Sequence, residues 1–374
     1  MENPVDRLRG ILSGAGYDFI EPPVLHDADT FLDLAGEDLR RRMYLTSSAE
    51  GIELCLRPDY TIPVALHHLT AGGDPRRVAS YAYCGPVFRQ RPGETGEFWQ
   101  AGVESIGRTD RADADADTLA LALGALAELG VRPAVRIGDQ SLFDALLDAL
   151  PVPDLWRRRL ARAFGDTPRL HELIEEMAGR SVRPRLGPIA ARHGGFPPTI
   201  EDVREEVARL FATGGIPEVG GRTVAEIAER YFEHTALTAG SPESLDAANI
   251  LLRFLAISGP PDRAALALGE LAARETPAMA AAIGAFTERT HGFVRHGIDI
   301  DAIHFAADFG RRLDYYTGFI FELSDPSRGG GRPLAGGGRY DRLLSLIRTR
   351  NGTGEDIPAV GFALWLDRLG VPAR

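Results

Sequence analysis

The residues with the clearest capacity for chemistry surround a polar loop in the first third of the chain. One strand-like run ends in Phe88 and Arg89, the polar segment QRPGETGE follows, and a second strand-like run presents Gln100 and Glu104. Because Gln100 and Glu104 are four residues apart, they lie on one face of a strand. An arginine opposite an amide and a carboxylate would suit a zwitterionic ligand, since Arg89 pairs a carboxylate and Glu104 pairs an amine. The same pattern also fits a cross-strand Arg–Glu pair on a solvated sheet.

Two further segments combine aromatic or glycine residues with charge. The run LDYYTGFIFEL contains Tyr315 and Tyr316. In a strand these side chains would point to opposite faces, one toward a pocket and the other into packing. The segment GGGRYD at 336–341 would form a flexible turn, or else allow the backbone to approach a ligand closely. Neither segment specifies a function by itself.

The composition excludes several mechanisms. The 374 residues contain no lysine, which excludes a P-loop, a Schiff-base lysine and a kinase strand lysine. The formal net charge of −11 disfavours a surface built to grip a nucleic-acid backbone. Cys55 and Cys84 are too few for a disulfide framework, and their spacing matches no metal motif, so no metal site is predicted.

The elements that must position these residues follow from hydrophobic periodicity. Helices are predicted within 1–20, over 113–130 with acids in the first turn, and over 342–350. Strands are predicted within 43–57, as a long-looped hairpin over 80–107, and at 133–137, 300–309, 313–323 and the start of 358–370. Because strands and helices are segregated instead of strictly alternating, an antiparallel sheet is favoured over a doubly wound parallel one.

Strand signals largely vanish between 151 and 290, where helical patterns are separated by Pro and Gly. We therefore predict an α+β core formed by 1–150 and 291–374, interrupted by a helix-rich insertion over 151–290. The first residues lack the apolar run of a signal peptide, and no stretch approaches about 18 apolar residues. A soluble cytoplasmic protein without a membrane partner is expected.

Five motifs together resemble the histidyl-tRNA synthetases in sequence and in order. They are LRPDYT (56–61), the GPVFR hairpin with its Q-x-G-x-E return (85–104), RRLDYYTGFIFE (311–322), AGGGRYD (335–341) and PAVGFALWLDRL (358–369). The resemblance implies a class II aminoacyl-tRNA synthetase core, an antiparallel sheet of six to seven strands flanked by helices. It also implies a dimer, formed through a first segment that contains Pro23.

The resemblance further implies roles for individual positions. A histidine-like pocket would be formed by Asp59, Thr61, Arg89, Gln100, Glu104, Arg311, Tyr315 and Tyr316. Vestigial ATP-site positions would be Arg89, Trp365 and Arg368, where the family grips phosphates with arginines.

Departures from the family change the expected function. The sequence ends six residues after Arg368, so no anticodon-binding domain and no tRNA binding are expected. Trp365 stands where the family has a glycine that lets ATP lie against the strand, and an indole there would occupy nucleotide space. The loop after Arg89 carries Glu94 and Glu97, which would repel a triphosphate. We therefore expect no catalytic residue and no cofactor.

A histidine pocket without ATP or tRNA machinery resembles the synthetase-like regulatory subunits of ATP phosphoribosyltransferase in bacteria whose catalytic subunit is the short form. That resemblance implies a hetero-oligomer with the short-form catalytic subunit and feedback by histidine. The alternative is a truncated ligase that activates histidine or a similar amino acid. A structural scaffold with an empty pocket is a third reading. The sequence leaves three points open. They are the stoichiometry of the hetero-oligomer, the surface that meets the catalytic subunit, and whether inhibitory histidine binds the pocket or the interface between subunits.

Overall fold

A computed structural model describes residues 3–34, 37–180, 242–311, 315–328, 332–349 and 354–371, together with five residues between 201 and 209. Contacts divide the chain into unit 1, which is Met1–Ala149, Phe164–Thr167 and Phe254–Arg374, and unit 2, which is Leu150–Ala163 and Pro168–Arg253. Every predicted site residue belongs to unit 1. Residues 254–290, predicted as part of the insertion, also belong to unit 1, while 181–200 and 210–241 of that insertion lie outside the described residues.

The strands of the main sheet are Asp18–Phe19 (β1), Ala79–Phe88 (β5), Glu97–Ile106 (β6), Ala134–Asp139 (β7), Ser258–Gly259 (β8), Ile303–Ala306 (β9), Phe319–Ser324 (β10), Ala335–Arg339 (β11) and Ala359–Trp365 (β12). Among the described residues this is a nine-stranded sheet in the order β1-β5-β6-β12-β11-β10-β7-β9-β8. The prediction of a purely antiparallel sheet with six to seven strands is therefore wrong. β1 pairs with β5, and β7 pairs with β9, in parallel.

The error lies at the edges of the sheet. The six central strands, β5-β6-β12-β11-β10-β7, are each antiparallel to their neighbours, as expected for the core. At the edges, β1 and β8 have two residues each, which is too short for an alternating pattern. The parallel pairing of β7 with β9 depends on a long crossover, whose direction no local sequence pattern reveals.

The glycine run at 336–338 is a buried strand, so of the two alternatives for this segment the flexible turn is wrong. In β11, a Cβ on Gly336 would lie 2.8 Å from the guanidinium of Arg311, and one on Gly338 would lie 2.9 Å from the ring of Tyr316. Side chains alternate along a strand, so Arg339 shares its face with Gly337 and points away from Gly336. We call the side of Gly336 and Gly338 the pocket face, and the side of Arg339 the helix face.

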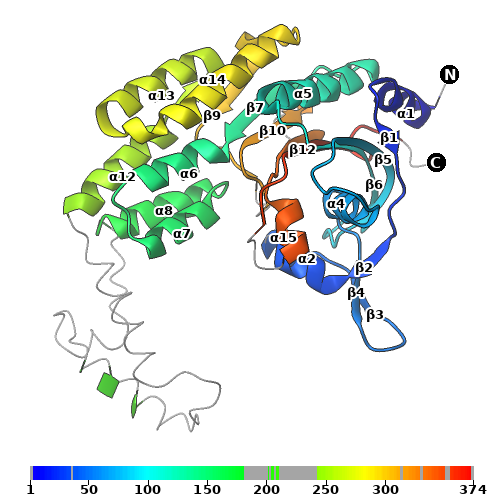
Figure 1. The fold of residues 1–374 in the computed structure, drawn as a ribbon, viewed down its shortest axis with the longest axis horizontal. Coiled ribbons are helices and arrows are strands. Elements are labelled where there is room, and N and C mark those ends of the chain that lie inside the picture. The colour runs from blue at the N-terminus through cyan, green and yellow to red at the C-terminus, as the bar shows by residue number, and fades with distance from the viewer. Residues whose placement is uncertain are drawn as a thin grey trace. The chain divides into compact units, whose positions relative to one another are not determined.

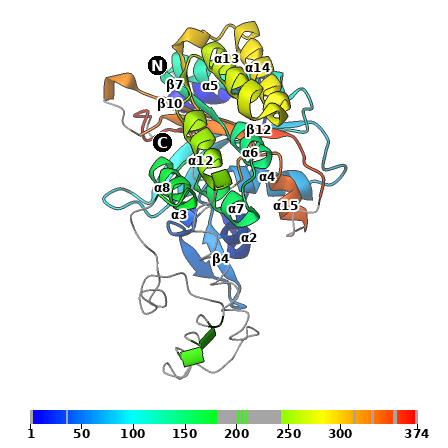
Figure 2. The same ribbon diagram turned by 90° about the vertical axis from the view of Figure 1, so that its left-hand side faces the viewer.

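The helices of unit 1 are Pro4–Gly14 (α1), Ala28–Leu34 (α2), Glu37–Arg40 (α3), Thr61–Thr70 (α4), Arg111–Glu128 (α5), Gln140–Ala149 (α6), Pro261–Glu275 (α13), Ala280–Arg295 (α14) and Leu343–Thr349 (α15). Unit 2 contains Asp154–Ala163 (α7), Thr167–Met177 (α8) except its first residue, and Pro242–Leu255 (α12) except its last two residues. Both views place α5 and α14 on one side of the main sheet, and α4 and α15 on the other (Figures 1 and 2).

Local sequence explains the first of these helices. The side chain of Asn3 accepts a hydrogen bond from the amide of Val5 at 3.1 Å, and Pro4 occupies the first turn, where a missing N–H costs nothing. Val5, Leu8 and Leu12 form its buried stripe. The helix stops before Gly16, which adopts φ +85°. The prediction of a helix within 1–20 is confirmed.

A second, three-stranded sheet contains the strands Leu25–Asp27 (β2), Leu45–Ser47 (β3) and Glu53–Leu56 (β4), in the order β2-β4-β3. β3 and β4 are antiparallel, which confirms the paired strands predicted within 43–57. β4 leads directly to the LRPDYT segment, so this sheet sets the position of Asp59. None of the described helices is long and apolar enough to cross a membrane.

Candidate functional site

The predicted pocket residues come together on the pocket face of the main sheet. Strand register pairs Trp365 with Gln100, and Gly361 with Glu104, so these four share one face. A small cavity there is lined by seven of the eight predicted pocket residues and by Trp365: Asp59, Thr61, Arg89, Gln100, Arg311, Tyr315, Tyr316 and Trp365. Glu104 lies directly beneath, beside Gly361. The prediction that these positions converge is confirmed, while their role in binding a ligand stays a prediction.

Asp59 is a buried carboxylate that no described residue satisfies with a well-aligned hydrogen bond. It lies just before α4 and is 5% exposed, and neither Oδ1 nor Oδ2 accepts a hydrogen bond of good geometry from the described residues. Burial raises the pKa of this carboxyl, although the guanidinium groups of Arg89 and Arg311 and the nearby amides of Ile62 and Thr61 oppose that rise. An unpaired buried acceptor is costly, so Asp59 is the group in this cavity that most needs a donor.

Glu104 is satisfied by the protein itself. Thr61 Oγ1 donates to Glu104 Oε1 at 2.8 Å, and the hydroxyl of Tyr340 donates to Oε2. Burial raises the pKa of Glu104 to about 8, although hydrogen bonds from Tyr340 and Thr61 act to lower it. Neighbouring Gln100 differs, because its buried Oε1 has no hydrogen-bond partner in the part of the chain that the structure describes. The acceptors left for a ligand are therefore Asp59 and Gln100.

Arg311 crosses the pocket and takes up much of its space. Its Nη1 donates to the hydroxyl of Tyr316 at 2.9 Å, and its Nε lies 3.3 Å from Glu322 Oε1. The guanidinium also lies 5.5 Å from the centroid of the Trp365 ring. Arg89 also lines the cavity, and its Nε donates to the carbonyl of Pro58 at 2.6 Å. The described residues contain no Arg89–Glu104 pair, so the alternative of a simple cross-strand ion pair is wrong.

Aromatic side chains close the remaining space. Tyr60 stacks on Tyr83 with ring centroids 4.3 Å apart and planes 5° apart, and Arg57 lies 4.2 Å over the Tyr60 ring. Trp365, 4% exposed, belongs to the same buried cluster as Tyr60 and Tyr83. The cavity that remains is about 30 Å³, enough for one or two waters. In this conformation the pocket is too small for an amino acid.

The two adjacent tyrosines do not separate as a strand would require. β10 begins at Phe319, so Tyr315 and Tyr316 lie in the turn before it, and residues 312–314 lie outside the described residues. Their ring centroids are 5.2 Å apart, and both rings line the cavity. The prediction that they point to opposite faces is wrong, because the alternation rule applies only within a strand.

The predicted ATP-site positions are occupied by internal contacts. The guanidinium of Arg368 lies 4.5 Å over the Trp365 ring, and its Nη1 donates to the carbonyl of Pro333 at 2.5 Å. Burial lowers the pKa of Arg368 to about 10. In the loop between β5 and β6, Arg91 pairs with Asp367 at 2.9 Å and with Glu94 at 3.1 Å. These arginines are engaged with the protein itself.

Two tyrosines of the site were missed as site residues. Tyr340 caps Glu104, and the hydroxyl of Tyr83 donates to the carbonyl of Phe362 at 3.1 Å. The signal for Tyr340 is its place in the motif GGGRYD, whose two interpretations, a flexible turn and a close backbone approach to a ligand, both concern the glycines and give the tyrosine no role. Tyr83 lies in strand β5 opposite Gly102 of β6. This pairing puts Tyr83 at the pocket, and it can be assigned only once the register of the hairpin is known.

The raised pKa of Glu104 predicts a pH-dependent stability. In the unfolded chain this carboxyl ionises near pH 4.5, and in the folded chain near pH 8, so the folded state holds more protons between these values. Ionisation then favours unfolding, and Glu104 lowers the free energy of unfolding by about 1.4 kcal/mol per pH unit. Glu104→Gln removes this effect, so the variant should gain stability relative to the unchanged chain between about pH 5 and about pH 8.

Urea unfolding at both pH values measures this gain. Glu355→Gln, at a carboxylate whose side chain is 80% exposed, is the matched control. A stability difference for Glu104→Gln that is the same at both pH values would mean that Glu104 is ionised in the folded chain.

Sequence comparison places this geometry among known proteins. The model of the histidyl-tRNA synthetase family matches residues 1–219 and 221–369. The ATP phosphoribosyltransferase regulatory subunit of Mesorhizobium japonicum is 43% identical over 355 residues, which cover 94% of this chain and 92% of that protein. The protein of the same name from Agrobacterium fabrum is 42% identical over 357 residues, covering 94% of this chain and 91% of that protein.

Solved structures share the fold. A Bacillus halodurans protein described as an ATP phosphoribosyltransferase regulatory subunit/histidyl-tRNA synthetase aligns with a TM-score of 0.66 at 24% identity, covering 98% of this chain and 77% of that chain. Histidyl-tRNA synthetase from Nostoc sp. PCC 7120 aligns with a TM-score of 0.61 at 17% identity, covering 98% and 69%. The predicted histidyl-tRNA synthetase-like class II fold is confirmed, with the corrected sheet.

Proposed function

This chain belongs to the family of ATP phosphoribosyltransferase regulatory subunits, within the wider histidyl-tRNA synthetase family, and we propose that it serves as such a subunit in the first step of histidine biosynthesis. The observation that carries this proposal is the 43% identity to a regulatory subunit over 94% of the chain. Its partner would be a short-form catalytic subunit that joins ATP to phosphoribosyl pyrophosphate in the cytoplasm. The chain would contribute no catalytic residue and no cofactor.

The alternative, an amino-acid-activating ligase, requires space and charge for ATP next to the amino acid. Trp365 is buried against Tyr60 and Tyr83 on the face where the nucleotide would lie. Arg368, which lies over the Trp365 ring, is held by the carbonyl of Pro333, and Arg91, in the loop after Arg89, is held by Asp367 and Glu94. Adenylate formation needs preorganised positive groups that stabilise the negative charge developing on the phosphates. Here the two guanidinium groups are engaged in contacts within the protein. They support regulation over ligation and an absence of tRNA charging.

We propose histidine as the effector, with the pocket of Asp59, Gln100 and Glu104 as one site for it. Two oxygens of Asp59 and one of Gln100 are buried and accept no well-aligned hydrogen bond from the described residues, which matches the three N–H donors of an ammonium group. Arg311 and Tyr316 would have to move, because only about 30 Å³ is open. Binding would therefore select a second conformation, which is what an effector requires in order to shift an equilibrium.

We also propose that the chain forms a dimer through its first segment, around Pro23. Arg57 fixes this segment to the start of the pocket, because its Nη1 donates to the carbonyl of Pro22 at 2.6 Å and its Nε donates to the carbonyl of Pro86 at 2.9 Å. The same guanidinium contacts the hydroxyl of Tyr60 at 2.6 Å. A dimer contact around Pro23 would thus be linked through Arg57 to Tyr60, one of the aromatic side chains that close the pocket.

The purified chain is expected to show no histidine-dependent exchange of pyrophosphate into ATP and no charging of tRNA. The physical reason is the indole of Trp365 in nucleotide space together with the engaged arginines. An active histidyl-tRNA synthetase assayed in parallel provides the control. Exchange at even about one hundredth of that enzyme's rate would favour the ligase, since it would correspond to a loss of only about 2.7 kcal/mol in transition-state stabilisation.

A further inference from the structure

A second cavity, much larger than the pocket, lies on the helix face of the sheet. It measures about 430 Å³ and lies between the first turn of α5, helix α14 and the end of β11. Ligand sites usually measure about 300–1,000 Å³. Arg289 and Arg339 form its deep end, and Asp113 and Glu288 lie at its rim. Because the side chain of Arg339 lies on the face of β11 opposite to the pocket face, the sheet separates this cleft from the pocket. We call it the helix-face cleft.

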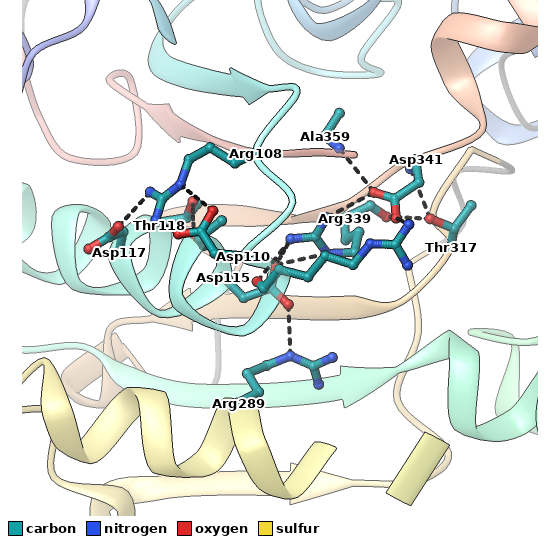
Figure 3. A network of polar contacts seen from close by, with 12 residues as sticks. Arg108, Asp110, Asp115, Asp117, Thr118, Arg289, Thr317, Arg339, Asp341 and Ala359 are labelled. Atoms are coloured by element: carbon teal, nitrogen blue, oxygen red, sulfur yellow. Dashed lines mark hydrogen bonds and ion pairs between the residues drawn. The ribbon is translucent and has the colours of Figure 1, made fainter. Parts of the chain in front are cut away.

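The deep end is a rigid network of ion pairs (Figure 3). Arg339 donates to Asp115 Oδ1 from Nη2 at 2.6 Å, and to Asp341 from Nη1 at 2.9 Å. Arg289 donates to Asp115 Oδ2 from Nε at 2.8 Å, and to Asp139 from Nη1 at 2.6 Å. The side chains of Arg289 and Asp115 are 7% and 1% exposed. The network holds two guanidinium groups in fixed positions beside open space.

Arg289 has hydrogen-bonding capacity to spare. Among the described residues its Nε and Nη1 are bonded, and its Nη2 has no partner. A guanidinium carries five N–H donors in a fixed fork, so both donors of Nη2 are left for an acceptor. The three carboxylates of the network already accept hydrogen bonds from Arg289 or Arg339. Arg111, 3.3 Å from Asp341, balances the third carboxylate of the network, so the group missing at the deep end is a hydrogen-bond acceptor for Arg289 Nη2, such as one oxygen of a ligand carboxylate.

The rim has the opposite need. Asp113 Oδ1 and Glu288 Oε1 share one cation, Arg295 Nη2, at 2.7 and 3.0 Å. Two carboxylates with one guanidinium leave one negative charge, and the second oxygen of each acid has no hydrogen bond from the described residues. Arg111, also at the rim, faces Asp341 at 3.3 Å. A cationic group would find unpaired acceptors between Asp113 and Glu288.

We propose that the helix-face cleft is a second small-molecule site, which binds an amino acid with its carboxylate on Arg289 Nη2 and its cationic end between Asp113 and Glu288. A ligand that places an acceptor at the deep end and a cation at the rim is a zwitterion. Because such a ligand has no net charge, its binding avoids burying one. The fixed deep end supplies preorganised recognition of the carboxylate.

L-Histidine is the probe, a choice that rests on the proposed function. Calorimetry on the full chain is expected to show histidine binding that is weakened roughly tenfold or more by Asp113→Asn/Glu288→Gln and by Arg289→Lys, which keeps the charge but loses the fork. Histamine, which lacks the carboxylate, and imidazolepropionate, which lacks the amine, should each bind at least about tenfold more weakly. Glu104→Gln, on the pocket face, changes only the pocket, so a histidine affinity that falls in the rim variant but not in Glu104→Gln is expected if histidine occupies the helix-face cleft.

The double variant Asp74→Asn/Glu355→Gln is the matched control, because it removes the same charge from two exposed carboxylates elsewhere on the surface. Because the rim acids are exposed, their variant tests the site even if Arg289→Lys does not fold. No histidine binding, or binding that the rim variant leaves intact, would overturn the site. Binding lost only in Glu104→Gln would assign histidine to the pocket alone. Failure of the proposed function would appear separately, as an absent effect on the catalytic subunit.

Discussion

Mixing this chain with a short-form catalytic subunit of ATP phosphoribosyltransferase is expected to form a stable hetero-oligomer and to raise the turnover of that subunit, and histidine should lower the turnover of the assembly. Regulation is a coupling free energy, so histidine must bind two states of the assembly with different affinity. A typical coupling of about 1–3 kcal/mol corresponds to a 5–150-fold change in apparent affinity. Reciprocity requires the partner's substrates to weaken histidine binding by the same factor.

Light scattering and a turnover assay on the mixed subunits measure both halves of this prediction. The catalytic subunit alone is the reference for activity, and histidine titrations with and without ATP and phosphoribosyl pyrophosphate test reciprocity. An assembly whose turnover equals that of the catalytic subunit alone, or that ignores histidine, would contradict the regulatory role. Variants Glu104→Gln and Asp113→Asn/Glu288→Gln, tested in the same assay, separate the pocket from the helix-face cleft as the source of inhibition.

Replacement of Arg339 by methionine is expected to lower the free energy of unfolding of unit 1 by about 3–5 kcal/mol. Arg339 is 5% exposed and bridges two buried carboxylates, Asp115 and Asp341, while its Nη2 also donates to the carbonyl of Arg111 at 3.0 Å. Methionine fills a similar volume but removes one cation from the network, so Asp115 keeps only Arg289, Asp341 keeps only Arg111, and the buried carboxylates are no longer balanced. Removing one member of a buried ion pair costs far more than the net value of the intact pair.

Urea or thermal unfolding measures this loss, and Arg108→Met is the matched control. Arg108 also bridges two carboxylates, Asp110 and Asp117, but these are 51% and 38% exposed, so its removal should cost about 0–1 kcal/mol. Arg339→Lys, which keeps the charge but loses the planar fork, should fall between the two. Equal losses for Arg339→Met and Arg108→Met would mean that burial does not govern this network.

The sequence by itself determined the family, the order of the motifs and the central antiparallel strands. Gln100 and Glu104 could be assigned to one face because alternation within a strand is a local property. The helix at Pro4–Gly14 followed from Asn3, Pro4 and the apolar spacing, which are also local. The convergence of Asp59, Arg311 and Trp365 came from the resemblance to known synthetases and not from any local pattern.

Only the tertiary structure decided how these residues use their surroundings. Gly336 and Gly338 carry no side chain that could signal a strand, and their role is to admit Arg311 and Tyr316, which fill the pocket. The helix-face cleft joins residues as distant in sequence as Asp115, Arg289 and Arg339, and no spacing rule connects them. The parallel edge strands are likewise set by crossovers. Contacts between distant segments depend on burial and register across the whole sheet, and local periodicity carries no information about either.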